Sequence, residues 1–161
     1  MKKLIGVLVI LVLTLIPESC LKQPPSVEDV ESFVKKNWNE IVIINDYLLG
    51  LENRDASISY ADGSIFIDSA NGQIEDDSVR GAIQSLWKEG CTSIYKSIYG
   101  DVSNAIDYCI WTRLGECCGF VYAIDHTRPP ELEYPTELVP LSIEGWYYYV
   151  ENYEKWRENN D

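Results

Sequence analysis

The stretch from Ala105 to Asp125 is the sequence feature that most constrains how this 161-residue chain can fold. It contains two alternating runs, AIDYCIWTR and CCGFVYAID, which are rich in aromatic and β-branched residues and flank a short break at Gly115. Two such runs around a glycine-containing break predict a β-hairpin. The stretch also holds three of the five cysteines, so the core and any thiol chemistry are expected on or near this hairpin.

Residues 1–20 have the layout of an export signal. Lys2 and Lys3 precede an apolar run, Leu4–Ile16, which is shorter than the roughly 20 residues that a transmembrane helix needs. Cys20 follows this run, and a thiol at this position resembles the lipidated cysteine of bacterial lipoprotein signals. The resemblance implies a lipid on Cys20 that anchors the protein to the outer surface of the cell membrane.

Three other interpretations of this segment remain open. The lipoprotein pattern places an aliphatic and a small apolar residue where this chain has Pro17 and Glu18, whereas Ser19 fits it. Cleavage without lipidation would secrete the protein, and an uncleaved segment would itself act as the anchor. A buried N-terminal helix is the third alternative, and Pro17 would end it.

Acidic residues outnumber basic ones, with 26 Asp and Glu against 13 Lys and Arg, for a formal net charge of −13. A surface of this sign repels phosphate backbones and anionic lipid, which disfavours nucleic-acid binding. Membrane contact is therefore expected through the N-terminal anchor alone. The ordinary explanation of such acidity is solubility. The more specific alternative is that the acidic surface binds a basic partner or a cation.

Residues 21–25 (LKQPP) are expected to form a linker, and residues 26–161 a single domain. A helix is predicted over residues 26–49. Ser26 and Asp29 form a variant of the capping box at its start, and apolar residues then recur every three or four positions.

A second hairpin is predicted over Ser57–Asp68, with Asp62-Gly63 as its two-residue turn. In that register Tyr60 faces Ile65, and Ile58 faces Ile67. Asn71-Gly72 then predicts a further turn.

The remaining segments complete an α+β fold. They are a helix from Asp76 or Asp77 to Gly90, a short strand at Cys91–Ser97, a long connection at His126–Pro140, a strand at Trp146–Val150 and a short helix at Glu151–Asn159. The order α-β-β-α-β-β-β plus a C-terminal strand or helix predicts an antiparallel sheet of about five to six strands with two main helices. This order resembles that of profilin-like and roadblock-type domains, and a resemblance of element order implies a fold but no function.

Four cysteines of the expected domain are candidates for disulfides, because export permits them: Cys91, Cys109, Cys117 and Cys118. They allow three complete pairings. If Leu114-Gly115 is the tip of the central hairpin, Trp111 faces Cys118 and Cys109 faces Phe120. Cys109 and Cys118 then share a face as diagonal neighbours, and our preferred pairing joins Cys91 to Cys117 or Cys118.

The adjacent pair Cys117-Cys118 has two interpretations. A disulfide between neighbours would be a strained, readily reduced ring suited to a redox switch, whereas consecutive strand residues ordinarily point to opposite faces. A thiol or redox-active protein that uses this pair with His126 is therefore the alternative function. No phosphate-binding, dinucleotide, serine-hydrolase or zinc-protease motif occurs, so we predict no catalytic residue, metal site or cofactor.

The aromatic run Trp146, Tyr147, Tyr148 and Tyr149 is the candidate binding surface, because alternate rings on a strand face opposite sides. The competing interpretation is that these rings fill the core. The sequence as a whole predicts an exported, lipid-anchored, non-catalytic domain that binds an unidentified protein, peptide or saccharide.

Overall fold

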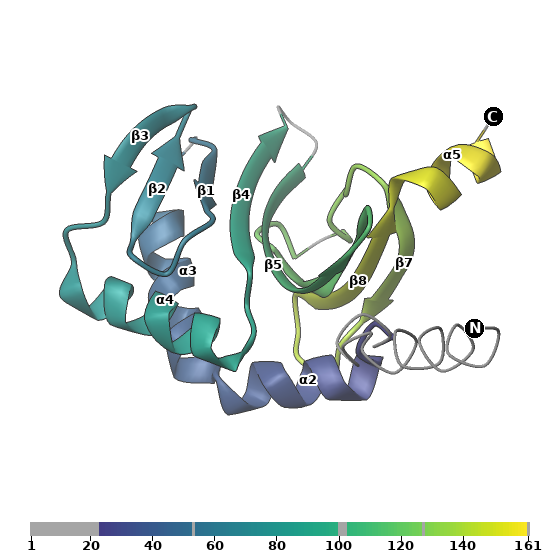
Figure 1. The fold of residues 1–161 in the computed structure, drawn as a ribbon, viewed down its shortest axis with the longest axis horizontal. Coiled ribbons are helices and arrows are strands. Elements are labelled where there is room, and N and C mark those ends of the chain that lie inside the picture. The colour runs from purple at the N-terminus through teal and green to yellow at the C-terminus, as the bar shows by residue number, and fades with distance from the viewer. Residues whose placement is uncertain (1–22, 53, 100–102, 127, 161) are drawn as a thin grey trace, which may run out of the picture.

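The computed structural model describes residues 23–52, 54–99, 103–126 and 128–160. This part of the chain forms four helices and one open, antiparallel sheet of eight strands (Figure 1). The helices are α2 (Val27–Lys36), α3 (Trp38–Leu49), α4 (Asp77–Glu89) and α5 (Tyr153–Asn160). The strands are β1 (Ala56–Ile58), β2 (Ser64–Ile67), β3 (Ala70–Gln73), β4 (Ser93–Tyr99), β5 (Ser103–Arg113), β6 (Glu116–Ala123), β7 (Pro135–Pro140) and β8 (Trp146–Asn152).

The predicted α+β class is confirmed, but the sheet has eight strands where about five to six were expected. Its strand order is β3-β2-β1-β4-β5-β6-β8-β7, so the predicted central hairpin, β5 with β6, lies inside the sheet. Leu114 and Gly115 at its tip have φ values of 40° and 85°, the left-handed region that a tight two-residue hairpin turn requires. The proposed export signal, including Cys20, lies outside the described residues.

Helices α2, α3 and α4 cover one face of the sheet. Figure 1 shows α3 and α4 beside β1, β2 and β4, and α2 beneath the strands of the other half. Apolar side chains of the helices and of that sheet face make one continuous core, which includes Val30, Val34, Ile41, Ile44, Leu48, Ile83, Leu86, Ile58, Ile94, Ile106, Tyr108 and Phe120. Each such aliphatic side chain contributes about 1.5–3 kcal/mol when fully buried. The alternate residues of the same strands point to the opposite face, which these helices leave open.

The helix predicted over residues 26–49 is two helices. Asn37, with φ −107° and ψ 23°, separates α2 from α3, and its side-chain amide donates to the carbonyl of Phe33 at 2.9 Å. Asparagine side chains compete with helical backbone hydrogen bonds in this way. The predicted capping box of Ser26 and Asp29 is present at the start of α2.

The register predicted for the second hairpin is wrong. Ala56, not Ile58, pairs with Ile67, and residues 59–63 form a wider loop in which Tyr60 is exposed. A tight turn occurs in the next hairpin, where Asp68-Ser69 joins β2 to β3 and both residues have positive φ. Asn71-Gly72, the expected turn, lies within strand β3.

The connection predicted over residues 126–140 contains the edge strand β7, with Pro135 and Pro140 at its two ends. Proline has no N–H to donate to a neighbouring strand. An edge strand tolerates it because one side of that strand has no neighbour. The predicted last strand and closing helix are confirmed as β8 and α5.

Candidate functional site

A β-bulge shapes the middle of the sheet. Cys109 pairs with Gly119 and Trp111 with Cys118, so Ile110 has no partner across the hairpin. The expected pairing of Trp111 with Cys118 is therefore observed, whereas the expected pairing of Cys109 with Phe120 is wrong. An extra residue in one strand moves every residue beyond it to the other face relative to the partner strand.

Gly119 permits the close approach of the two strands at this bulge. A Cβ atom at this position would lie 1.9 Å from the carbonyl oxygen of Tyr108, well inside the contact distance of two atoms. Only glycine fits here without moving the backbone.

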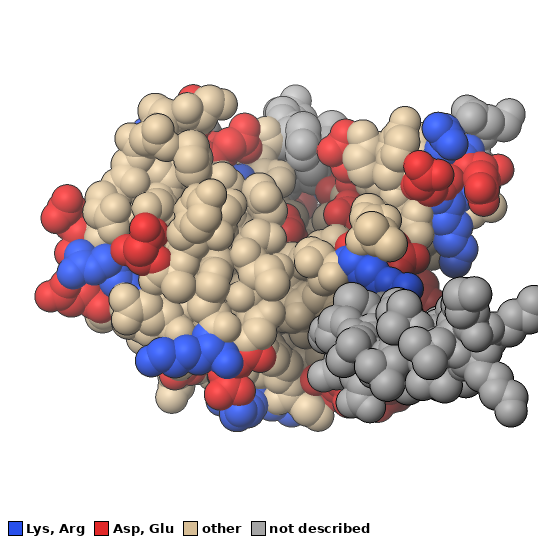
Figure 2. Space-filling model, in the orientation of Figure 1, with Lys and Arg blue, Asp and Glu red and all other residues tan. Residues whose placement is uncertain are grey.

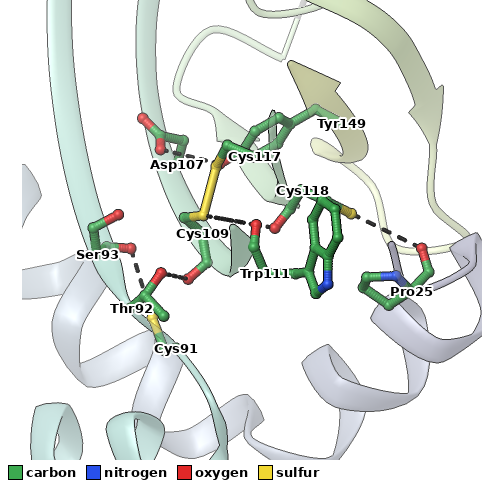
Figure 3. The surroundings of a disulfide bond; sticks show 10 residues. All are labelled: Pro25, Cys91, Thr92, Ser93, Asp107, Cys109, Trp111, Cys117, Cys118 and Tyr149. Carbon is green, nitrogen blue, oxygen red and sulfur yellow. Dashed lines mark hydrogen bonds between the residues drawn. A yellow bond between two sulfur atoms is a disulfide. The ribbon is translucent and has the colours of Figure 1, made fainter. Parts of the chain in front are cut away.

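The bulge also decides the cysteine pairing. It places Cys109 on the same face as Cys117, and these two residues form the disulfide of the structure, with Cα atoms 6.4 Å apart. The preferred pairing of Cys91 with Cys117 or Cys118 is wrong, because Cys91 and Cys118 are free and buried. Figure 3 shows Cys117 directed toward Cys109 and Tyr149, and Cys118 directed away from them toward Pro25.

The disulfide lies in a cleft of about 500 Å³ on the sheet face opposite the three helices. Its lining comes from β4, β5, β6, β8 and the segment before β7: Ser93, Tyr95, Ser97, Asp107, Cys109, Thr112, Cys117, Glu131, Leu132, Glu133, Tyr134, Tyr149 and Glu151. The register explains this set. Tyr95 pairs with Asp107 across β4 and β5, and Cys117 pairs with Glu151 across β6 and β8, so these side chains share one face.

Asp107 lies at the centre of this face, on strand β5. The surrounding protein encloses its carboxyl group, and the part that stays accessible opens into the cleft. The phenolic hydroxyl of Tyr149 donates to Asp107 Oδ1 at a long 3.4 Å and lies 3.4 Å from Cys117 Sγ. Burial, followed by repulsion from Glu151, raises the pKa of Asp107 to about 7.

Glu151 is the second enclosed acid of the cleft. Its side chain accepts a hydrogen bond from the backbone N–H of Tyr134 at 3.3 Å, and burial raises the pKa of this carboxyl group. Two acids held with raised pKa values in one cleft are typical of a functional site.

A hollow of about 430 Å³ adjoins the cleft near the hairpin tip and shares Thr112, Cys117, Tyr134 and Glu151 with it. Two aromatic rings line it, those of Tyr134 and Tyr153, whose centroids are 5.0 Å apart in an edge-to-face contact, and Trp156 packs on Tyr134 in the same way at 5.4 Å. The two hollows together form an elongated groove.

Another hollow of about 380 Å³ adjoins the cleft on the side of β1 and β2 and shares Tyr95 and Ser97 with it, but it differs from the cleft in its charges. It contains a cation, Lys96, whose amine donates to the carbonyl of Glu52. Its acids have partners as well, because Asp68 accepts from Arg54 and from the N–H of Asp55, and Asp55 accepts from the N–H of Ile98. This hollow is therefore electrostatically compensated.

The aromatic run is largely buried, so the exposure expected for a binding surface is not observed in three of its four rings. Trp146, Tyr148 and Tyr149 are 3%, 4% and 1% exposed, and Tyr147 is half-buried. Both faces of β8 are covered: Trp146 and Tyr148 pack in the core under the helices, and Tyr149 packs with Val121. Tyr149 still contributes to the cleft wall.

The thiols and the histidine of the redox alternative do not meet in the described residues. Cys117 is bonded to Cys109, and Cys118 lies on the opposite face, where burial raises the pKa of its thiol to about 11. The imidazole of His126 instead lies 2.7 Å from the hydroxyl of Tyr122. The vicinal ring is not formed, and the ordinary alternation of strand residues holds.

The start of the described chain lies on the face opposite the cleft. The carbonyl of Pro25 accepts from the hydroxyl of Tyr148 at 3.3 Å and contacts Cys118 Sγ at 3.9 Å, both of which point to the helix side. Pro25, the last residue of the expected linker, therefore lies behind the sheet, away from the cleft.

Sequence reasoning missed Asp107 and Glu151. A signal for Asp107 exists, because this acid interrupts an apolar strand in the middle of the central hairpin. Nothing in the sequence brings Glu151 close to it, since they meet only through the pairing of β5, β6 and β8.

No protein-family model, curated protein or solved structure matches this chain. The described residues contain no group of three or more His, Cys, Asp or Glu side chains placed to hold a metal ion. Within the same ranges, no helix combines the length and the apolar character needed to cross a membrane.

Proposed function

We propose that this chain is an exported domain, anchored through a lipid on Cys20, that holds a ligand in the cleft around Asp107 and catalyses nothing. The anchor is inferred from the sequence of residues 1–20. The binding role is supported by one observation above all: a cleft of about 500 Å³ with convergent polar groups lies on the open face of the sheet.

The position of the linker supports the same arrangement. Pro25 contacts the helix side of β6 and β8, so an anchored domain would present the cleft away from its attachment point. Residues 21–25 span at most about 17 Å when extended, which would keep the domain close to the membrane. A ligand outside the cell would then reach the cleft without passing between the domain and the lipid.

Charge also supports binding to something other than nucleic acid. Figure 2 shows single basic side chains interspersed with acidic ones on the visible face, and no basic patch. With a net charge of −13, the surface opposes contact with phosphate backbones.

The binding role is tested by filling the cleft. Ser93→Phe places a ring at a lining position of β4, and Ser32→Phe places one at an exposed position of α2. Both variants and the wild type are purified as full chains from the producing cell, and native mass spectrometry then identifies bound molecules. We expect a ligand on the wild type and on Ser32→Phe but not on Ser93→Phe, and an equally loaded Ser93→Phe protein would rule the cleft out.

The anchor is tested separately by metabolic labelling with a radioactive fatty acid. Label is expected on the wild type and on Cys91→Ala, and none on Cys20→Ser. Label that persists in Cys20→Ser would show that the lipid is attached elsewhere.

A further inference from the structure

We propose that the ligand of the cleft is a small organic cation, an alkylammonium or guanidinium compound, whose charge is balanced by Asp107. This inference rests on the proposed binding function and specifies the chemical class of the ligand. It follows from what the cleft contains and from what it lacks.

Asp107 lacks a cation. Its hydrogen bond from another residue is the long one from Tyr149, and no lysine, arginine or histidine of the described residues forms an ion pair with it. An enclosed carboxylate without a counter-charge destabilises a fold, because water no longer solvates it. A bound cation would supply the counter-charge that the described residues do not provide.

The charged residues that line the cleft beside Asp107 are all acidic. From the segment before β7 come Glu131 and Glu133, from β8 comes Glu151, and no basic side chain is among the lining residues described for the cleft. Basic side chains line the two adjoining hollows instead: Lys96, whose amine donates to the carbonyl of Glu52, lies on the side of β1, and Arg113 lies at the hairpin tip. The cleft itself has acidic lining alone and is complementary to a positive charge.

The walls of the cleft suit an organic cation better than a bare ion. The rings of Tyr95, Tyr134 and Tyr149 line it, and aromatic faces attract ammonium and guanidinium groups. Tyr95 is 43% exposed at the rim, while Tyr149 is buried at the floor beside Asp107. A volume of about 500 Å³ exceeds the needs of a single ion and falls in the range of small-molecule sites.

The experiment is calorimetric titration of the full chain in mild detergent with agmatine, which carries both a guanidinium and an ammonium group. Maltose is the neutral probe. Asp107→Asn removes the charge and keeps the shape, and Asp46→Asn removes the same charge from an exposed position of α3 outside the cleft. Thermal unfolding of each variant confirms that it is folded.

We expect agmatine to bind the wild type and Asp46→Asn with affinities within about twofold of each other, and Asp107→Asn at least about tenfold more weakly. If Asp107→Asn does not fold, Glu151→Gln replaces it, with a loss in the same direction. Equal binding of agmatine to Asp107→Asn and Asp46→Asn would overturn the inference, as would no binding of agmatine to the wild type.

Failure of the cation inference is distinguishable from failure of the binding role. Maltose that binds the wild type but not Ser93→Phe, with no binding of agmatine, would keep the cleft as the ligand site and exclude the cation. Agmatine binding that survives in both Ser93→Phe and Asp107→Asn would place the cation elsewhere and remove this support from the cleft.

Discussion

Cys117 and Cys118 are neighbours in the chain, yet their side chains lie on opposite faces of the sheet. Cys117 is bonded to Cys109 in the floor of the cleft, whereas Cys118 is buried on the helix side, near the carbonyl of Pro25. The two residues therefore belong to different parts of the molecule, one to the candidate site and one to the core. Their thiol chemistry should differ accordingly.

Thiol labelling of unreduced, denatured protein should place the label on Cys91 and Cys118, besides Cys20 if it is not lipidated. Cys109 and Cys117 should stay unlabelled, because they form the disulfide. In the folded protein Cys91 should react slowly as well, since burial raises the pKa of its thiol to about 12. Tandem mass spectrometry locates the labels, and a label on Cys109 without reductant would contradict the pairing.

Loss of the disulfide should lower stability modestly. The bridge closes a short loop, with a sequence separation of 8, for which the chain-entropy model gives about 2–3 kcal/mol. The double variant Cys109→Ser, Cys117→Ser should therefore have a free energy of unfolding lower by this amount, as measured by urea unfolding. A matched measurement on the wild type with reductant should give the same shift, and no shift in either case would show that the bridge does not form in solution.

Gly119→Ala should destabilise the protein severely or prevent folding, because the added methyl group meets the carbonyl oxygen of Tyr108. Gly81→Ala is the matched control. Gly81 lies in α4, and a methyl group added there would meet nothing within 4 Å, so alanine should raise stability by about 0.5–1 kcal/mol. Urea unfolding of both variants measures the contrast, and similar stabilities would refute the close approach at the bulge.

The bulge also shows how far the sequence predicts this structure. Alternation and turn chemistry predict the central hairpin, its tip and the pairing of Trp111 with Cys118, because these depend on local preferences. The extra residue at Ile110 has no local signal, since every residue near it suits a strand. The missed bulge moves Cys109 from the face of Cys118 to that of Cys117, so the predicted shared face of Cys109 and Cys118 is wrong for this reason.

The candidate site depends on non-local pairing to a still greater extent. Asp107 and Glu151 belong to β5 and β8, with β6 between them, and the cleft exists only once all three strands are in register. The aromatic run of β8 was predicted from its composition alone, and its exposure could not be predicted because it depends on what covers each face of that strand. Its rings mostly fill the core, while the acids that lie beside them in the structure define the cleft.

Tyr108→Phe should cost about 1–3 kcal/mol although it removes a single oxygen atom. The hydroxyl of Tyr108 donates to Asn45 Oδ1 at 2.6 Å, both side chains are buried, and the variant leaves the amide oxygen without that donor. Tyr95→Phe, at an exposed position, should change stability little. Adding Asn45→Leu to Tyr108→Phe should recover part of the loss, and a cost that is equal for the two tyrosines would contradict the buried hydrogen bond.

Asp107→Asn should change the pH dependence of stability in a defined direction. The carboxyl group has a pKa of about 7 in the folded protein and about 3.8 in the unfolded chain, so the folded state binds the proton more tightly. The stabilising contribution of protonated Asp107 is therefore complete below about pH 4 and is lost as the pH rises through 7. The neutral amide does not lose it, so relative to the wild type the variant should gain up to about 4 kcal/mol between pH 4 and pH 8. Urea unfolding of both proteins at pH 5 and pH 8 measures the part of this gain between those pH values, about 2–3 kcal/mol, and Asp46→Asn controls for the loss of one negative charge. A variant that is less stable than the wild type by the same amount at both pH values would show that Asp107 serves the fold rather than the cleft.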